Sequence, residues 1–368
     1  MKFTINAKTF AALLAKLSRV IATRNAILIL DNFRITLTDG AVTVIASDVE
    51  NTAFAGLAAV SSEDNGTFCI NAKALTSLAK SIGDQPMTLE LNGGEAVIST
   101  ATGRYTLPTF AGEDYPLPQI VDGSQITLTS SQLIRALNKT SWAASTEEIR
   151  PQLRGVCIDL KPEGITFCAT DTRKLCAYTL PHPCECHMTV ILPTKAAKLA
   201  ATLLPGTDAI VDITIGEKAV SFTSSDISLT STLIKGTFPS YERVIPADAP
   251  NPIALTRTEL QCATARVSAF SNDASRLVCL ALEADTLRVA TKDPSRLTAA
   301  TEKLPCEYSG TPLIIGFHAE YLAQVLSSIT NEDVQLQITD PARPMKITEA
   351  DEFGQFTIVL MPMNILNE

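Results

Sequence analysis

Alternating apolar and polar residues run through most of the chain, and this pattern predicts half-buried antiparallel strands. In such a strand every second side chain faces a core and the others face solvent. The alternation is clearest in four segments: Val42–Ile45, Met87–Leu91, Ile210–Ile215 and Val334–Ile338. Gly can take up the positive φ that tight turns require, so we expect hairpin connections at three Gly-containing segments: Thr38–Gly40, Lys161–Gly164 and Ile215–Lys218.

Apolar residues recur at helical spacing in six segments. The predicted helices are Ala7–Arg19, Ala72–Lys80, Thr129–Lys139, Thr194–Leu204, Thr256–Val267 and His318–Ile329. Two of them begin with the spacing of a capping box, in which a Thr side chain and a Gln or Glu three residues later satisfy each other's backbone amides. The expected pairs are Thr129 with Gln132 and Thr256 with Glu259.

Landmarks along the chain recur about every 123 residues, which indicates one fold repeated three times. Pro116, Pro239 and Pro362 each close a β-rich stretch, and they are spaced 123 residues apart. We therefore predict an α+β protein of three repeated domains, each with two helices packed on antiparallel sheets of about eight strands. The predicted domains are residues 1–122, 123–248 and 249–368.

Smaller repeats fall inside this pattern. The tripeptide Asn6–Lys8 recurs as Asn71–Lys73 at the start of a second helix, so each repeat is expected to consist of two similar halves. Asp48, Asp171 and Asp293 lie near corresponding positions of the three repeats. Their recurrence favours a repeated turn or edge feature over a catalytic pair.

The composition fits a protein with several packed cores. A length of 368 residues exceeds the usual size of one domain, and 46% of the residues are hydrophobic. Lys16 interrupts the apolar stretch near the N-terminus, which argues against a signal peptide, and no apolar run approaches the ~20 residues of a membrane span. Nine scattered cysteines favour reduced thiols over a disulfide framework. We expect a cytoplasmic protein.

Charge is distributed unevenly in this acidic chain. The formal net charge is −9, yet the four predicted helices of the first two repeats contain Lys and Arg but no Asp or Glu. Such segregation suggests that the helices share a surface facing a polyanion such as DNA. The alternative is that short amphipathic helices carry Lys on their solvated faces. The third repeat fits less well, because Glu259 and Glu320 fall inside its helices.

Signatures of catalysis are missing from the sequence, which contains no Gly-rich phosphate loop and no Gly-x-Ser-x-Gly motif. The segment His182–His187 contains two His and two Cys, but their spacing is too tight for ordinary structural zinc, so we favour an exposed loop. We expect no enzymatic activity, no metal and no cofactor. A scaffold that binds only proteins remains the alternative to a nucleic-acid-binding protein.

Four sequence segments resemble the bacterial DNA polymerase III β subunit family, the replicative sliding clamps. The segments are Ala169–Leu175, Gly236–Pro246, Gly316–Tyr321 and Val359–Met363. The resemblance runs from the N-terminus to the C-terminus and includes the threefold repeat. It implies a head-to-tail homodimer that closes into a ring around duplex DNA, with helices lining the hole. The implied partners are the replicative polymerase, the clamp loader and other proteins with clamp-binding motifs.

The resemblance also implies which residues bind DNA. By position these are Arg24, Lys73, Arg150 and Lys195, and the helix that contains Lys195 suggests Lys198 in addition. Contacts to phosphates without base readout are expected, because a sliding protein cannot hold one sequence. Positions that are often basic or aromatic in the family differ here: Glu147, Pro151, Gln152 and Thr194.

A hydrophobic cleft for partner peptides is implied between the second and third domains. The matching positions are Leu153, Thr170, Thr172, Arg173, Leu175, Pro239, Arg243, Val244, Tyr321, Pro344, Val359, Leu360, Met361, Pro362 and Met363. Without the resemblance, the segment Ile358–Met361 is better interpreted as a last core strand. Asn364 replaces a usually basic position, and a short tail follows it. The implied dimer interface contains Phe270 on one side and Tyr105 and Leu107 on the other.

Overall fold

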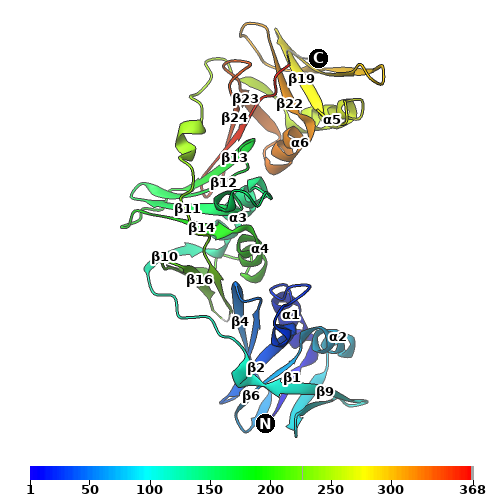
Figure 1. Ribbon diagram of the computed structural model, residues 1–368, viewed down its shortest axis with the longest axis vertical. Coiled ribbons are helices and arrows are strands. Elements are labelled where there is room, and N and C mark those ends of the chain that lie inside the picture. Colours follow the sequence, from blue (N-terminus) through cyan, green and yellow to red (C-terminus); the bar gives the residue numbers. More distant parts are fainter. Residues whose placement is uncertain (226, 366–368) are drawn as a thin grey trace. The chain divides into compact units, whose positions relative to one another are not determined.

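The computed structural model describes residues 1–225 and 227–365 (Figure 1). All six predicted helices are confirmed, and their ends differ from the predictions by one or two residues. They are α1 (Ala7–Leu17), α2 (Ala72–Ile82), α3 (Ser130–Thr140), α4 (Thr194–Leu203), α5 (Arg257–Ser268) and α6 (Ala319–Ser328). The described residues also form five 3₁₀ turns that the sequence pattern does not predict: Leu28–Asp31, Gly112–Asp114, Ser141–Ala143, Pro151–Leu153 and Tyr241–Val244.

Local hydrogen bonds explain where the helices begin. Asn6 and Asn71, the repeated Asn residues, each cap a helix by accepting from the amide three residues later. The capping box of α3 is present, since the amides of Thr129 and Gln132 bond to each other's side chains at 3.0 and 3.2 Å.

The capping box predicted for α5 is wrong, because the Thr256 side chain makes no capping bond. Glu332, which is distant in the sequence, supplies acceptors at this helix start instead. Its carbonyl accepts from the Arg257 amide at 2.7 Å, and its carboxylate accepts from Thr258. Hydrogen bonds from Thr258 and the nearby guanidinium lower the pKa of Glu332, which keeps it an acceptor.

The chain divides into two compact units, each described here by itself. Unit 1 consists of residues 1–137 and 192–235, and unit 2 consists of residues 138–191 and 236–368. The predicted middle repeat therefore contributes to both units. The predicted domain boundaries stay a prediction.

Unit 1 contains one sheet of 13 strands in the order β10-β15-β16-β17-β4-β3-β2-β6-β9-β8-β7-β1-β5. The strands are β1 (Lys2–Asn6), β2 (Asn32–Thr38), β3 (Ala41–Ser47), β4 (Asn51–Ala58), β5 (Ser61–Glu63), β6 (Gly66–Asn71), β7 (Pro86–Asn92), β8 (Glu95–Ser99), β9 (Arg104–Ala111), β10 (Ser124–Thr129), β15 (Ile210–Ile215), β16 (Ala219–Ser224) and β17 (Ile227–Thr232). Helix α1 packs against both α2 and α4, and Figure 1 shows α1 and α2 side by side.

Two further sheets, of eight and four strands, have the orders β14-β11-β12-β13-β25-β24-β23-β18 and β21-β20-β19-β22. Their strands are β11 (Gly155–Lys161), β12 (Gly164–Thr170), β13 (Lys174–Leu180), β14 (Met188–Pro193), β18 (Ile253–Thr256), β19 (Leu277–Glu283), β20 (Thr286–Asp293), β21 (Thr298–Pro305), β22 (Leu313–His318), β23 (Asp333–Gln337), β24 (Met345–Ala350) and β25 (Gln355–Leu360). The three predicted hairpin turns join β2 to β3, β11 to β12 and β15 to β16.

Corresponding strands join the repeats in the same way in both units. In unit 1, β17 pairs with β4, and the Thr232 amide donates to the Glu50 carbonyl at 2.9 Å. In unit 2, β25 pairs with β13, and the Met361 amide donates to the Arg173 carbonyl at the same distance. Continuous sheet pairing thus links one repeat to the next. The interpretation of Ile358–Met361 as a core strand is confirmed for all but its last residue.

The three recurring Asp residues stabilise turns, as predicted. Asp48 accepts from the Asn51 amide, Asp171 from the amides of Arg173 and Lys174, and Asp293 from the Ser295 amide. In each turn the Asp carboxylate accepts a hydrogen bond from a backbone amide two or three residues later, which stabilises the turn. The recurrence of Asp is therefore structural.

Candidate partner-binding pocket and nucleic-acid interface

An apolar pocket of about 270 Å³ lies in unit 2. It is lined by Leu153, Thr170, Thr172, Arg173, Lys174, Leu175, Pro239, Tyr241, Val244, Val359 and Met361. Nine of these residues were predicted for the partner cleft. The structure therefore brings together residues from four separate segments of the chain.

The pairing of β13 with β25 builds one wall of the pocket. Leu175 and Val359 are direct partners across these strands, so their side chains lie on the same face of the sheet. The turn before β13 bends sharply at Thr172, whose φ is 77°. That bend places Thr172 and Arg173 at the rim.

Sequence reasoning missed Lys174 and Tyr241 in the pocket lining. The Lys174 side chain is 6% exposed, and its ammonium pairs with Asp171 at 2.5 Å and lies 4.7 Å from the centre of the Tyr321 ring. Tyr241 donates to Asp159 at 2.8 Å, and burial is the main reason that its pKa is raised, so it stays a neutral donor. Both residues lie within the segments that resemble the sliding-clamp family, and that position could have indicated that they line the pocket.

Six residues predicted for the cleft are not in the pocket lining: Arg243, Tyr321, Pro344, Leu360, Pro362 and Met363. Leu360 is buried and follows Val359, so strand alternation turns its side chain to the other face of β25. Tyr321 contacts Lys174 from α6. Met363 pairs with Gly316 of β22.

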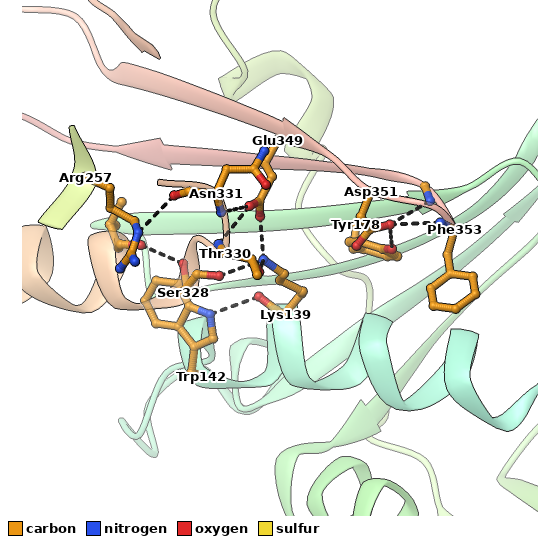
Figure 2. A network of polar contacts seen from close by, with 12 residues as sticks. Lys139, Trp142, Tyr178, Arg257, Ser328, Thr330, Asn331, Glu349, Asp351 and Phe353 are labelled. Atoms are coloured by element: carbon orange, nitrogen blue, oxygen red, sulfur yellow. Dashed lines mark hydrogen bonds and ion pairs between the residues drawn. The ribbon is translucent and has the colours of Figure 1, made fainter. Parts of the chain in front are cut away.

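A buried polar network in the same unit fixes the elements that carry the pocket (Figure 2). Lys139, at the end of α3, donates to the Ser328 carbonyl, to Thr330 and to Glu349 of β24. Nearby, Tyr178 of β13 donates to Asp351, which also accepts from the Phe353 amide. Side chains of the middle repeat are thus bonded to the third repeat at two points.

Most of the residues predicted to bind DNA are exposed. Arg24 lies in the loop after α1, Lys73 in α2, Lys198 in α4 and Arg150 before the Pro151–Leu153 turn. Lys73 and Lys80 line a hollow of about 670 Å³ together with hydroxyl and amide side chains: Ser18, Thr23, Asn71, Thr76 and Ser77. Asp31 also lines this hollow and adds one negative charge.

Several basic residues of the predicted helix surface are engaged within the protein, among them Lys8, which forms an exposed ion pair with Asp84. Lys195 forms an ion pair with Asp48 of the neighbouring repeat and donates to the Val20 carbonyl at 3.3 Å. Lys139, counted among the helix charges, is buried against Glu349. Lys139 is therefore not available to a polyanion, because a carboxylate 210 residues away neutralises it.

The three residues predicted for a dimer interface lie at or near the surface. Tyr105 and Leu107 belong to β9, where Tyr105 is exposed and Leu107 is half-buried. Phe270 follows α5 and is exposed. Exposed rings of this size are suited to burial against another protein.

The segment His182–His187 forms a loop between β13 and β14, as favoured from the sequence. Across the described ranges 1–225 and 227–365, no group of three or more His, Cys, Asp or Glu side chains is placed to hold a metal ion. None of the helices in those ranges is long and apolar enough to cross a membrane.

Comparison with known families and structures identifies the chain. The family models of the DNA polymerase III beta subunit match along its length: the N-terminal domain at residues 1–119, the central domain at 127–240 and the C-terminal domain at 242–364. Among similar proteins, the beta sliding clamp of Caulobacter vibrioides is 29% identical and that of Escherichia coli K12 is 26% identical. Each alignment covers 99% of this chain and 100% of the relative.

Solved structures agree with the sequence comparison. The sliding clamp of Pseudomonas aeruginosa bound to griselimycin superposes with a TM-score of 0.95 at 26% identity, covering 99% of this chain and 100% of that one. The clamp of Bartonella birtlesii, also bound to griselimycin, gives a TM-score of 0.91 at 27% identity, covering 99% of this chain and 100% of that one. The predicted α+β fold of three repeated domains and the expected non-enzymatic role agree with these relatives. The chain belongs to the DNA polymerase III beta subunit family, the sliding clamps.

Proposed function

We propose that two copies of this chain form a ring around duplex DNA and tether the replicative polymerase to it. The observation that carries this proposal is that one chain has both a basic helix surface, in unit 1, and an apolar pocket, in unit 2. The first suits a phosphate backbone, and the second suits a short hydrophobic peptide. Processivity then arises from topology, without any chemical step.

Two features of the helix surface support DNA binding: its positive charge and the packing of its helices against one another. Helices α1, α2 and α4 contain no acidic residue, and α1 packs against both of the others. Their exposed lysines therefore gather in one region of unit 1. We propose that Arg24, Lys73, Lys195 and Lys198 of unit 1 and Arg150 of unit 2 contact phosphates, with Lys195 exchanging its bond to Asp48 for one to DNA.

The pocket supports peptide binding through its shape and composition. An apolar wall from Leu175 and Val359 lies beside Thr170, Thr172 and Arg173, which can fix the orientation of a bound chain. The pliable side chain of Met361 suits several partners. Griselimycin accompanies two similar clamps in their solved structures, so we also propose that it occupies this pocket here.

Further parts of the proposal follow from the family. The dimer interface uses Phe270 of one copy and Tyr105 and Leu107 of the other, and its closure makes a ring of six domains. The domain boundaries at residues 122/123 and 248/249 define these domains. The partners are polymerase, clamp loader and other proteins with clamp-binding motifs, and the protein acts in the cytoplasm.

The experiment is primer extension on a primed single-stranded circle with an ATP-driven clamp loader and a limiting amount of replicative polymerase. Addition of this protein should lengthen the products of a single binding event severalfold or more. A scaffold that binds only proteins would leave product length unchanged. The controls are a reaction with polymerase alone and a reaction from which the clamp loader is omitted.

A further inference from the structure

The chain after β25 is attached at two points, one just before β13 and one on β22. At the first, the Met361 amide donates to the Arg173 carbonyl beside the pocket, at 2.9 Å. At the second, the Met363 amide donates to the Gly316 carbonyl at 2.8 Å, in an isolated antiparallel bridge. Strand β22, which contains Gly316, is the edge of its four-stranded sheet, so its outer side pairs with no other strand among the described residues and can accept the tail.

Ile365 extends this attachment with a side-chain contact. It lies in a depression of about 190 Å³ together with Leu277, Cys279, Ala290, Thr291, Lys292 and Pro294. A Cβ added at Gly316 would lie 2.6 Å from the Ile365 side chain, 2.7 Å from the Leu277 side chain on the neighbouring strand β19, and 3.3 Å from the Met363 carbonyl oxygen. No real Cβ sits that close to another carbon, so the absence of a side chain at position 316 is what lets the tail approach β22.

We propose that Ile365 and Gly316 form an anchor that holds Met361 and Met363 in position for a peptide bound in the pocket. Both are positioning residues, since neither lines the pocket itself. This inference deepens the proposed function of the pocket and rests on it. It assigns a role to Ile365, which follows Asn364, where the sequence departs from the usual pattern of the family.

The physical reason is preorganisation. Without the anchor, the segment Met361–Ile365 loses its attachment to β22, and binding a peptide must then order it. Ordering backbone residues costs free energy that a preformed site avoids. Loss of the anchor should therefore weaken peptide binding by about tenfold, with little change in the thermal unfolding midpoint.

The test uses the full chain and two variants that break the anchor from opposite sides, Gly316→Ala and Ile365→Ser. Hydrogen exchange at the Met363 amide reports whether the tail is docked, and calorimetric titration with griselimycin reports on the pocket. Gly56→Ala is the matched control, because a Cβ at that strand glycine meets no atom within 4 Å. Ile365→Val keeps a branched apolar side chain and should retain most of the affinity.

We expect both anchor variants to lose protection at Met363 and to bind griselimycin about tenfold more weakly, while both controls match the parent. Unchanged affinity in a variant whose Met363 amide exchanges freely would overturn the inference and leave the pocket assignment intact. Full Met363 protection in both anchor variants would also overturn it. If griselimycin fails to bind the parent chain, the proposed pocket is wrong and this inference fails with it.

Discussion

Lys139 and Glu349 form an ion pair that is almost completely buried, with side chains 6% and 4% exposed and a distance of 2.5 Å between Nζ and Oε2 (Figure 2). Glu349 also accepts from the amides of Thr330 and Asn331, each at 2.7 Å. The pair joins the end of α3 to strand β24, so it links the middle repeat to the third. Within unit 2 it therefore helps to fix the two parts of the chain that supply the pocket.

Replacing one partner of this pair should destabilise the protein strongly. Lys139→Met leaves the Glu349 carboxylate buried without its cation, which typically costs about 3–5 kcal/mol. Adding Glu349→Gln should recover part of that loss, because a neutral amide still offers an oxygen to the two backbone amides. Urea unfolding of the single and double variants measures the effect. Lys8→Met, which breaks an exposed pair with Asp84, is the matched control and should change unfolding little.

Charge reversal on the helices should reduce the salt dependence of DNA binding. Lys73→Glu is expected to lower the slope of log K against log salt concentration by about one, since one phosphate contact is lost. Lys303→Glu on β21 makes the same change of charge outside the proposed surface and should have a smaller effect. Fluorescence anisotropy with a DNA duplex over a range of salt concentrations gives the slopes. Equal slopes for the parent and Lys73→Glu would remove α2 from the interface.

The Asp48–Lys195 pair predicts a gain of function. Asp48→Asn removes the carboxylate that holds Lys195, so that lysine becomes free for phosphate and DNA binding should tighten. Lys195→Glu should weaken binding, as for Lys73. The same anisotropy titration measures both variants at one salt concentration. Weaker binding by Asp48→Asn would indicate that the ion pair presents Lys195 to DNA instead of competing with it.

The pocket can be disabled without disturbing the helix surface. Deletion of Met361–Glu368 should abolish binding of polymerase-derived peptides, because it removes Met361 from the lining, while direct binding to duplex DNA persists. Val244→Asp is a milder change, since Val244 lines the pocket but is 44% exposed. Ile120→Asp, at a side chain that is 97% exposed outside the pocket, is its control. Peptide titrations with intact affinity in the deletion would contradict the assignment.

Thiol labelling should separate the cysteines by burial. Desolvation raises the pKa of Cys157, Cys168 and Cys176, so these thiols form little thiolate at pH 8 in the folded protein. Cys262 on α5 is exposed and should react with iodoacetamide first. Mass spectrometry of timed samples, with and without urea, checks the order. Early labelling of the three buried thiols in native buffer would contradict the packing of β11, β12 and β13.

Patterns of short range were enough to predict the helices and the turns. Each helix buries one apolar face, and the recurring Asp residues bond to amides only a few residues away, so the information lies within each segment. The capping box at Thr256 failed for the opposite reason, because Glu332 reaches that helix start from 76 residues further along the chain. Local sequence does not reveal such partners.

In the candidate site too, local sequence motifs predicted some residues, while contacts between distant residues could not be predicted. Eight pocket residues were found through motifs and Leu153 through its position along the chain, whereas Lys174 and Tyr241 were missed although they fall within those motifs. The partners of Lys195 and Lys139 lie 147 and 210 residues away, so folding alone decides which helix lysines remain free. The contact between Gly316 and Ile365 likewise depends on which strand edge the tail meets.

Encirclement of DNA is the central claim, and retention on circular DNA tests it most directly. Labelled protein is loaded onto a nicked circular duplex by an ATP-driven loader, excess protein is removed, and half of the sample is linearised with a restriction enzyme. The account predicts that the protein stays on the circles and slides off the linear molecules within the same interval. Equal retention on both forms would contradict it.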